Sequence, residues 1–290
     1  MVADSHRVKK PGETRMATRA PGSPTLPSDF HQFFTHPGEN TMQRGYALVT
    51  GAIGGLGTAI TKRLIAAGIP VIGTDRRGTD LESWRHEALD EAEQRQFSFV
   101  PLDVTKEEHI DQLAAQLRAE NKPIAYLINN AGIQGNAKPW DLSSKDWHRV
   151  IAVNLHGTFY MTRAFSKDMV DRGFGRVVNF ASMYAYHPGE GQSPYAAAKA
   201  GITGYTRSVA LDLAKYGVTV NTIAPGMIWH ERLRGVLPDQ VFEDMIGRVP
   251  AGRAGRPDEI AGAVGFFCSE ESSYVTGQTL HVNGGLYLPG

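Results

Sequence analysis

One stretch decides the fold of this chain: Tyr46-Ala47-Leu48-Val49-Thr50-Gly51-Ala52-Ile53-Gly54-Gly55-Leu56-Gly57. It starts as a short apolar strand, turns through glycines and enters a helix whose apolar residues recur at Ile60, Leu64 and Ile65. Glycines let a backbone turn tightly and approach a pyrophosphate, and the unpaired amides at a helix start attract its charge. Glycine-rich turns also serve as plain connectors, so this stretch alone does not distinguish a phosphate site from a simple turn. The end of the next strand provides the distinguishing residue.

That next strand, 70–75, ends in an acid, Asp75, eighteen residues after Gly57. An acid near this position accepts hydrogen bonds from the adenosine ribose and repels a 2′-phosphate. The pattern therefore predicts a dinucleotide cofactor and favours NAD over NADP. Arg76 and Arg77 keep the alternative open, because a guanidinium there can bind the 2′-phosphate instead.

Further along the chain, apolar strands alternate with amphipathic helices, which is typical of a parallel sheet covered on both faces. The pattern predicts an α/β, Rossmann-type, doubly wound seven-stranded parallel sheet in a single domain over 44–290. We expect strands at 46–50, 70–75, 97–102, 124–129, 175–181, 218–224 and 279–282. Helices are expected at 56–68, 80–94, 106–119, 146–172, 195–216 and 257–269. In such sheets ligands bind beyond the carboxyl ends of the strands, where Gly51, Asp75, Asp103, Asn130, Ser182 and Pro225 fall.

Tyr195 and Lys199 stand four residues apart, on one face of an expected helix, and thirteen residues beyond Ser182. An ammonium beside a phenol favours the phenolate, so the tyrosine pKa, ordinarily about 10, should fall towards neutrality. That would make Tyr195 a general acid and base. Tyr-x-x-x-Lys alone is weak evidence for a catalytic site, since helices carry many such pairs by chance. The other motifs of the chain make the evidence stronger.

Six motifs in this order and spacing resemble the short-chain dehydrogenase/reductase family. They are Thr50-Gly51-x-x-x-Gly55-x-Gly57, Asn129-Asn130-Ala131-Gly132, Asn154, Ser182, Tyr195-x-x-x-Lys199 and Pro225-Gly226. Stretches at 171–176 and 282–286 resemble the acetoacetyl-CoA reductase and 3-oxoacyl-carrier-protein reductase branch. The resemblance covers about residues 44 to 290 and implies reversible hydride transfer between a nicotinamide and a secondary alcohol or ketone.

The resemblance also implies roles for single residues. Tyr195 would be the general acid and base, Lys199 would lower its pKa and hold the nicotinamide ribose, and Ser182 would orient the carbonyl. Asn154 would distort its helix and hold a water that links the lysine to solvent. Asp103 and Val104 would contact adenine; the alternative is that Asp103 only caps the next helix. Asn130 would tie neighbouring strands together. The full set of predicted cofactor-binding residues is Gly51, Ile53, Gly55, Leu56, Gly57, Asp75, Arg76, Asp103, Val104, Asn130, Ala131, Gly132, Tyr195, Lys199, Pro225, Gly226 and Ile228.

The substrate is expected to be a small alcohol or ketone, and three segments should line its pocket: 133–140, 183–192 and a lid near 227–250. Candidate lining residues include Trp140, Tyr184 and Tyr186. His230 stands where a threonine of the family commonly contacts the carboxamide. The expected substrate is a 3-oxoacyl or related oxo compound, and the alternative is a sugar, polyol or cyclic alcohol. A non-catalytic dinucleotide sensor and an interaction scaffold remain as further readings of the same motifs.

Composition limits the partners, the covalent cross-links and the location that we expect for this chain. The formal net charge is zero and the pI about 7.2, with Lys and Arg scattered among acids, so we expect no nucleic-acid partner. Cys268 is the single cysteine, which excludes a disulfide within the chain, and no motif predicts a metal. No apolar run reaches membrane length, which favours a cytoplasmic protein. Residues 1–43, interrupted by prolines, are expected to form a disordered or loosely attached leader. The resemblance further implies a homotetramer.

Overall fold

The computed structural model describes residues 44–76, 81–229 and 239–289. The predicted leader 1–43, together with Arg77 and His230, lies outside these described residues.

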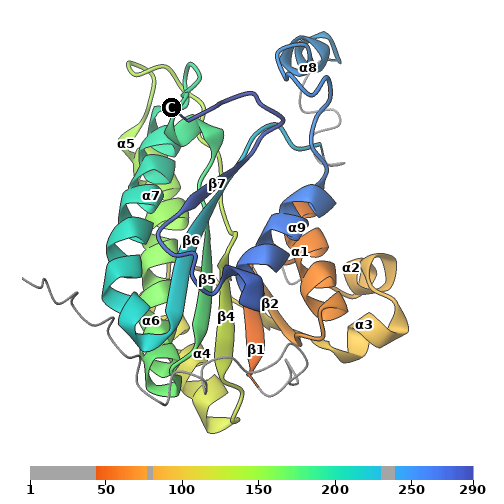
Figure 1. The fold of residues 1–290 in the computed structure, drawn as a ribbon. Helices are drawn as coiled ribbons and strands as arrows, with labels where there is room; N and C mark the ends of the chain where they lie inside the picture. Colours follow the sequence, from red (N-terminus) through yellow and green to blue (C-terminus); the bar gives the residue numbers. More distant parts are fainter. Residues whose placement is uncertain (1–43, 77–80, 230–238, 290) are drawn as a thin grey trace, which may run out of the picture. The chain divides into compact units, whose positions relative to one another are not determined.

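A single parallel sheet forms the centre of the fold (Figure 1). Its spatial order is β3-β2-β1-β4-β5-β6-β7. The strands are β1 (Tyr46–Thr50), β2 (Val71–Asp75), β3 (Phe97–Pro101), β4 (Ile124–Asn129), β5 (Gly175–Phe180), β6 (Val218–Pro225) and β7 (Thr279–Val282). The chain moves outward from β1 in one direction and then, from β4 on, in the other. The strand order therefore reverses between β1 and β4, where the carboxyl ends of a doubly wound sheet open a crevice for a ligand.

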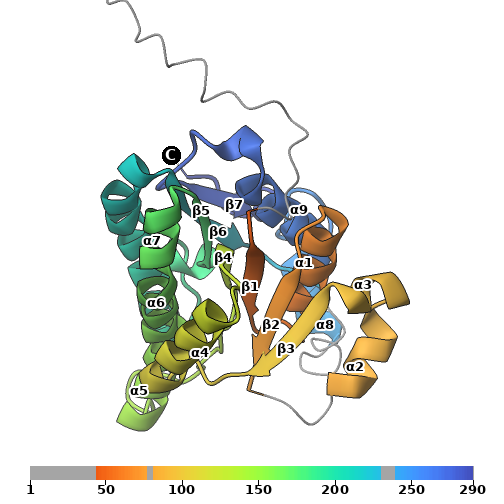
Figure 2. The same ribbon diagram turned by 90° about the horizontal axis from the view of Figure 1, so that it is seen from below.

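Helices cover both faces of the sheet, as the view from below shows (Figure 2). One face carries α1 (Gly55–Ala66), α9 (Pro257–Cys268) and the short α2 (Leu81–Ala88) and α3 (Glu91–Arg95). The other carries α4 (Glu107–Ala119), α5 (Ser144–Ile151), α6 (Gly157–Arg172) and α7 (Ser193–Leu213). Short turns η4 (Met183–Ala185), η5 (Ala214–Tyr216) and η7 (Glu270–Ser272) follow β5, α7 and α9. The helix α8 (Asp239–Ile246) belongs to the predicted lid segment.

Alternate residues of each strand enter different cores, because successive side chains of a strand point to opposite faces. Ala47 and Val49 of β1 pack with Ile60 and Leu64 of α1, whereas Leu48 joins the core beneath α4 and α6. Strands buried on both faces read as continuous apolar runs, which is why the strand predictions agree with the structure to within one residue at each end.

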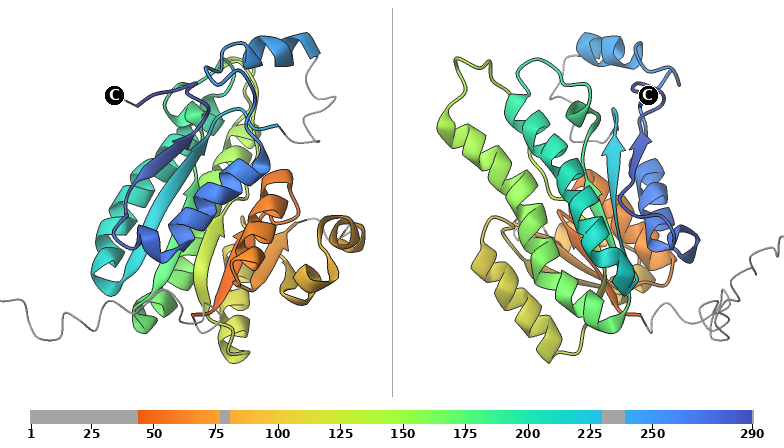
Figure 3. Two further views of the ribbon diagram at one scale, coloured as in Figure 1. Left: turned by 45° about the vertical axis from the view of Figure 1, so that its right-hand side comes forward. Right: turned by 60° about the vertical axis from the view of Figure 1, so that its left-hand side comes forward.

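The helix predictions agree with the structure to within three residues at each end, apart from two internal differences. The expected helix 80–94 is two helices, because Asp90 caps α3: its carboxylate accepts from the backbone N–H of Ala92 and Glu93, at 2.8 and 2.9 Å. The expected helix 146–172 starts earlier, at Ser144, and contains a π-helical turn, η3 (Ala152–His156), between α5 and α6. The three pieces form one long rod in Figure 3.

In the described part of the chain, no helix is both long and apolar enough to cross a membrane.

Candidate active site

The glycine turn between β1 and α1 forms a cradle at the strand ends. Gly51 has φ of +66°, a conformation that glycine adopts at little cost. A Cβ on Gly57 would lie 2.1 Å from the Gly51 carbonyl oxygen and 2.7 Å from that of Ala52, so only glycine fits there. The N-cap of α1 is Gly54, which has no capping side chain. The first amides of α1 are therefore placed to receive an anion, and the predicted Gly55, Leu56 and buried Ile53 lie in this same turn.

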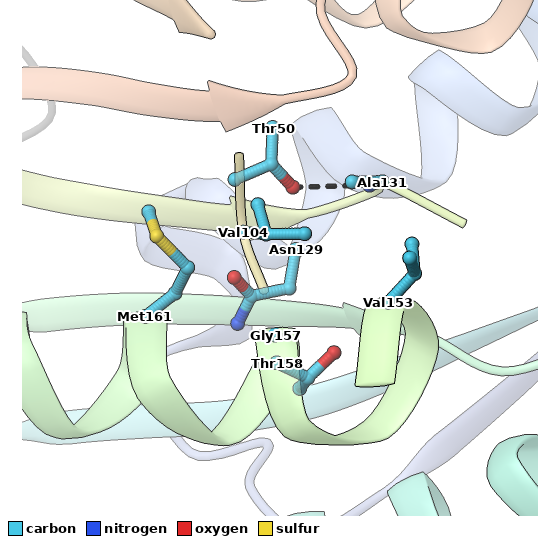
Figure 4. A pocket seen from close by; sticks show the side chains of 8 residues that line it. All are labelled: Thr50, Val104, Asn129, Ala131, Val153, Gly157, Thr158 and Met161. Carbon is cyan, nitrogen blue, oxygen red and sulfur yellow. Dashed lines mark hydrogen bonds between the residues drawn. The ribbon is translucent and has the colours of Figure 1, made fainter. Parts of the chain in front are cut away.

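Asn130 and Thr50 join this cradle to the end of β4. The Asn130 Nδ2 donates to the carbonyl oxygens of Thr50 and Gly51, at 2.9 and 3.2 Å. The Thr50 Oγ1 in turn accepts from the Ala131 N–H at 3.0 Å (Figure 4). The prediction that Asn130 ties neighbouring strands together is confirmed. The hollow drawn in Figure 4 lies below this junction and is lined by core residues such as Val104, Asn129 and Met161, so it belongs to the core and not to a substrate pocket.

Asp75 ends β2 beside the cradle, and the exposed Arg76 follows it. The Ala52 N–H donates to the carbonyl oxygen of Thr74, the residue before Asp75, at 3.0 Å. Asp103 lies just past β3, and its Oδ1 accepts from the backbone N–H and the hydroxyl of Thr105, at 3.0 and 2.8 Å. The N-cap of α4 is Lys106, so Asp103 orders the loop before the helix and does not cap it. Val104 is buried against α6.

Trp84 is a contact of the cofactor helix that the sequence pattern did not predict. Its indole N–H donates to the Thr58 Oγ1 at 2.9 Å, and the Thr58 hydroxyl donates to the Gly54 carbonyl oxygen at 2.8 Å. The ring also packs on Phe97, with 5.1 Å between centroids. Helix α2 is thereby fixed to the first turn of α1. The one available signal was a large aromatic residue on an otherwise polar helix.

The structure brings Ser182, Tyr195 and Lys199 together beyond the end of β5. Lys199 is 3% exposed; its Nζ donates to the Phe180 carbonyl oxygen at 2.7 Å and lies 5.5 Å from the Tyr195 ring centroid. Ser182 is buried and caps the η4 turn, accepting from the Tyr184 N–H at 3.2 Å. The Tyr184 ring meets the Tyr195 ring edge-on, at 6.2 Å between centroids. A phenol, a lysine amine and a hydroxyl thus converge at one strand end.

Burial controls the proton affinities of this cluster. Removal from water raises the pKa of Tyr195; a hydrogen bond with Ser182 acts in the opposite direction, and Tyr184 adds to the rise. Burial also lowers the pKa of Lys199 to about 7. The prediction of a lowered tyrosine pKa is therefore wrong for the protein alone, because desolvation of the phenolate outweighs its neighbours. Sequence spacing shows which groups are near each other but not how dry their site is.

Asn154 is fully buried in the π-helical turn, which confirms the predicted helix distortion. Its Nδ2 donates to the carbonyl oxygens of Ile133 and Val150, at 2.8 and 2.9 Å, while its Oδ1 is buried with no hydrogen-bond partner among the described residues. A Cβ on Gly132 would lie 2.7 Å from this Oδ1 and 3.5 Å from the Lys199 Nζ. Asn154 and Lys199 therefore flank Gly132. A buried unpaired carbonyl oxygen is a group that an ordered water commonly satisfies.

The loop after β6 completes the rim of the crevice. Pro225 ends the strand, and the Gly226 N–H donates to the Val282 carbonyl oxygen at 2.9 Å. Ile228 pairs with Gly255 in an isolated bridge. These contacts hold the predicted carboxamide loop against β7 and against the segment that precedes α9. Trp140, expected in the pocket, is 79% exposed, whereas Tyr184 faces Tyr195 as expected for a pocket wall.

The residues present fit a dinucleotide. The glycine turn leaves room for a pyrophosphate against the start of α1, Asp75 stands where a ribose would lie, and Lys199 and the 225–228 loop stand at the other end of the crevice. Such a group, when bound, supplies the hydride. No cluster of three or more potential metal ligands occurs among residues 44–76, 81–229 and 239–289.

Comparisons with known proteins agree with this geometry. Residues 51–287 match the family model described as enoyl-(acyl carrier protein) reductase. The chain is 37% identical over 247 residues to a 3-oxoacyl-[acyl-carrier-protein] reductase of Haemophilus influenzae, covering 85% of this chain and 100% of that protein. It is 40% identical over 248 residues to nodulation protein G of Azospirillum brasilense, covering 84% and 99%. A solved structure titled a putative gluconate dehydrogenase from Agrobacterium tumefaciens superposes with a TM-score of 0.78 at 33% identity, covering 83% of this chain and 95% of that one.

Fold, cofactor crevice and matches together define the class as NAD(P)-dependent oxidoreductase. Within that class, the chain belongs to the short-chain dehydrogenase/reductase family, as its motifs predicted.

The lowered pKa of Lys199 gives a stability prediction. Between pH 7 and its ordinary value of 10.5, the unfolded chain holds a proton on Lys199 that the folded chain has released, so wild-type stability rises with pH. Lys199→Met lacks this group. The free energy of unfolding of Lys199→Met should therefore lack this rise with pH. Between pH 7 and 9 we expect the free energy of unfolding of wild type, measured in urea, to gain about 2 kcal/mol relative to that of the variant, at about 1.4 kcal/mol per pKa unit. Lys145→Met, on the exposed face of α5, is the control. If the difference in free energy of unfolding between Lys199→Met and wild type stays constant with pH, Lys199 does not lose its proton on folding.

Proposed function

We propose that this enzyme reduces a 3-oxo compound to the secondary alcohol, reversibly, with Tyr195 as general acid and base. The observation that carries this is the convergence of Tyr195, Lys199 and Ser182 beyond β5, next to a crevice that fits a dinucleotide. Burial keeps the phenol protonated at neutral pH, and a protonated phenol is what ketone reduction needs as proton donor.

The other residues take supporting roles. Ser182 donates a hydrogen bond to the substrate carbonyl oxygen and steadies the charge that develops there. Lys199 holds the nicotinamide ribose beside the phenol. Asn154 holds a water on its unpaired Oδ1, and protons return from solvent through that water and Lys199.

The substrate proposal follows the relatives named as 3-oxoacyl-[acyl-carrier-protein] reductases. A sugar or polyol dehydrogenase is the second candidate, favoured by the structural neighbour titled a putative gluconate dehydrogenase. The test is a panel of 3-oxoacyl thioesters, cyclic ketones and polyols, assayed with both nicotinamide cofactors by absorbance of the reduced ring. We expect kcat/KM for a 3-oxoacyl thioester to exceed that for any polyol by at least about tenfold, roughly 1.4 kcal/mol of transition-state binding. A higher kcat/KM for a polyol than for the 3-oxoacyl thioester would favour the second candidate. If no compound of the panel is turned over, a non-catalytic dinucleotide-sensing protein is the better explanation.

For the cofactor we propose NAD, because of the carboxylate at the end of β2. Asp75→Ala should lower kcat/KM for NADH by about tenfold, the value of one lost hydrogen bond to a charged group, and should raise the relative rate with NADPH. Arg76→Ala removes a guanidinium that would bind only the 2′-phosphate of NADPH, so this matched neighbour should leave NADH kinetics unchanged. If wild type prefers NADPH and Arg76→Ala abolishes that preference, the guanidinium and not the carboxylate selects the cofactor.

We also propose a homotetramer, and a cytoplasmic location stays a prediction of the sequence. The exposed faces of α6 and α7 carry apolar side chains, Phe159 at 41% and Leu211 at 82% exposure, and Tyr274 is exposed before β7. Analytical ultracentrifugation should show a species of four times 31.6 kDa. A sole species of 31.6 kDa would contradict the assembly.

A further inference from the structure

Three aromatic side chains from distant parts of the sequence meet at one edge of the predicted substrate site. Tyr186 comes from the loop after β5, His281 from β7, and Tyr287 from the carboxyl-terminal segment. The Tyr186 and Tyr287 rings stack at 5.5 Å between centroids and 24° between planes, and His281 lies 4.7 and 5.2 Å from them. The Tyr186 hydroxyl donates to the Thr279 Oγ1 at 3.2 Å. We call these three residues the aromatic triad.

A turn at Asn283 directs Tyr287 into the triad. The Asn283 Oδ1 accepts from the Gly285 N–H at 2.9 Å, and its Nδ2 donates to the Tyr287 carbonyl oxygen at 2.7 Å. The Leu286 N–H donates to the Asn283 carbonyl oxygen at 3.1 Å. Asn283 is itself buried, so this turn is fixed from within the protein. In Figure 1 the chain leaves the top of β7, turns and ends, at the mark C, at the same end of the sheet as the strand tips.

The same segment contacts the cofactor loop and the lid. A Cβ on Gly226 would lie 2.6 Å from the Asn283 Cβ, so the two backbones are in close contact. The Ala251 N–H donates to the Gly284 carbonyl oxygen at 3.0 Å, and Val249 lies against Gly284. Residues 282–287 therefore join the loop after β6, the carboxyl end of the lid segment and the loop after β5.

The loop after β5 carries the groups that would face the substrate. Tyr186 is four residues from Ser182, and Tyr184 lies between them with its ring against Tyr195. The Tyr186 N–H donates to the Met183 carbonyl oxygen at 3.0 Å, which makes 182–186 a single ordered turn. A displacement of Tyr186 would thus move Ser182 and Tyr184. Burial lowers the pKa of His281, so its ring is neutral at physiological pH and packs against both tyrosines without a charge.

We propose that Tyr287 is a positioning residue: stacked on Tyr186, it holds the 182–187 loop in the geometry that places Ser182 on the substrate carbonyl. This role rests on the proposed carbonyl reduction. It gives the carboxyl-terminal segment a part in substrate binding and makes Tyr287 a determinant of the KM for the ketone. The contacts of this segment with the loop after β6 are made by Val282 and Asn283 and not by the Tyr287 ring, so the affinity for the cofactor should not respond.

The test compares Tyr287→Ala with Tyr287→Phe, which keeps the stack, and with Leu288→Ala, a neighbour that is 78% exposed. We expect Tyr287→Ala to raise the KM for the ketone about tenfold, with the cofactor Kd, measured by fluorescence titration, within twofold of wild type. Both other variants should behave as wild type. Unchanged ketone kinetics in Tyr287→Ala, or a cofactor Kd that rises in parallel with the KM, would overturn the proposal.

A second readout does not depend on activity. Hydrogen exchange at the amides of Ala185, Tyr186 and His187, which are bonded within the turn, should be about tenfold faster in Tyr287→Ala and unchanged in Leu288→Ala. If wild type reduces no ketone but this local acceleration is seen, the proposed function fails and the contact between the segment and the loop stands. If exchange in the loop is unchanged, or if it accelerates equally across the whole sheet, Tyr287 does not position the loop. Tyr287→Leu, which keeps side-chain bulk, replaces Tyr287→Ala if the alanine variant does not fold.

Discussion

Tyr195→Phe should lower kcat for ketone reduction by about 10³-fold, within the range of 10²–10⁴ that a positioned proton donor contributes. The substitution removes one hydroxyl and leaves the ring, so its packing against Tyr184 and Lys199 is kept. Because the hydroxyl acts on the substrate oxygen, the loss should appear in kcat, while the cofactor Kd stays within about twofold of wild type. Steady-state kinetics and fluorescence titration measure the two quantities.

The same helix offers a matched control for this substitution. Tyr205 also lies in α7, and burial also raises its pKa, with Thr162 as its hydrogen-bond partner. Tyr205→Phe should lose some stability, about 1 kcal/mol for a buried hydrogen bond, and keep its rate. If Tyr195→Phe retains a third or more of the wild-type kcat, the proton comes from another group, and the proposed mechanism is wrong.

Gly57→Ala should abolish cofactor binding, with the Kd rising by at least about 100-fold. The added Cβ would lie 2.1 Å from the Gly51 carbonyl oxygen and within 2.8 Å of the Ala52 carbonyl group, and these are backbone atoms that cannot rotate away. The turn has to open, which moves the first amides of α1 off the position that fits a pyrophosphate. Cofactor titration, and the rise of the melting temperature with added cofactor, report the effect.

Gly262→Ala is the control, since it makes the same change in the helix α9 with no other atom within 4 Å of the new Cβ. There alanine should stabilise the protein by up to about 1 kcal/mol through its higher helix propensity. Wild-type affinity for the cofactor in Gly57→Ala would show that the crevice beside the glycine turn is not the nucleotide site.

The fold could be predicted because its signals are local. Each central strand is buried on both faces and largely apolar, and each is followed by a motif at its carboxyl end, so strand positions and sheet topology follow from periodicity. The split between α2 and α3 was also visible in principle, since Asp90 and Glu93 form a capping box in the sequence. It was missed because the charged pattern continues through the break.

The residues of the candidate site could be predicted from the sequence, but the proton affinity of its tyrosine could not. Spacing and family resemblance placed Tyr195, Lys199 and Ser182 at one strand end, and the structure brings them together there. The rise in the pKa of Tyr195 follows from burial by the whole fold, which no spacing encodes. The contacts of Trp84 with Thr58 and of Tyr287 with Tyr186 join segments far apart in the sequence, and single aromatic residues carry no pattern that would pair them.

The proposed roles of Tyr195, Ser182 and Lys199 can be seen together in a crystal structure with reduced cofactor and an unreactive ketone. We expect the ketone oxygen within about 3.2 Å of both the Tyr195 hydroxyl and the Ser182 Oγ, as general acid catalysis requires, with the Lys199 Nζ on the nicotinamide ribose. A ketone bound with its oxygen away from both hydroxyls, or a nicotinamide placed away from Lys199, would contradict these roles.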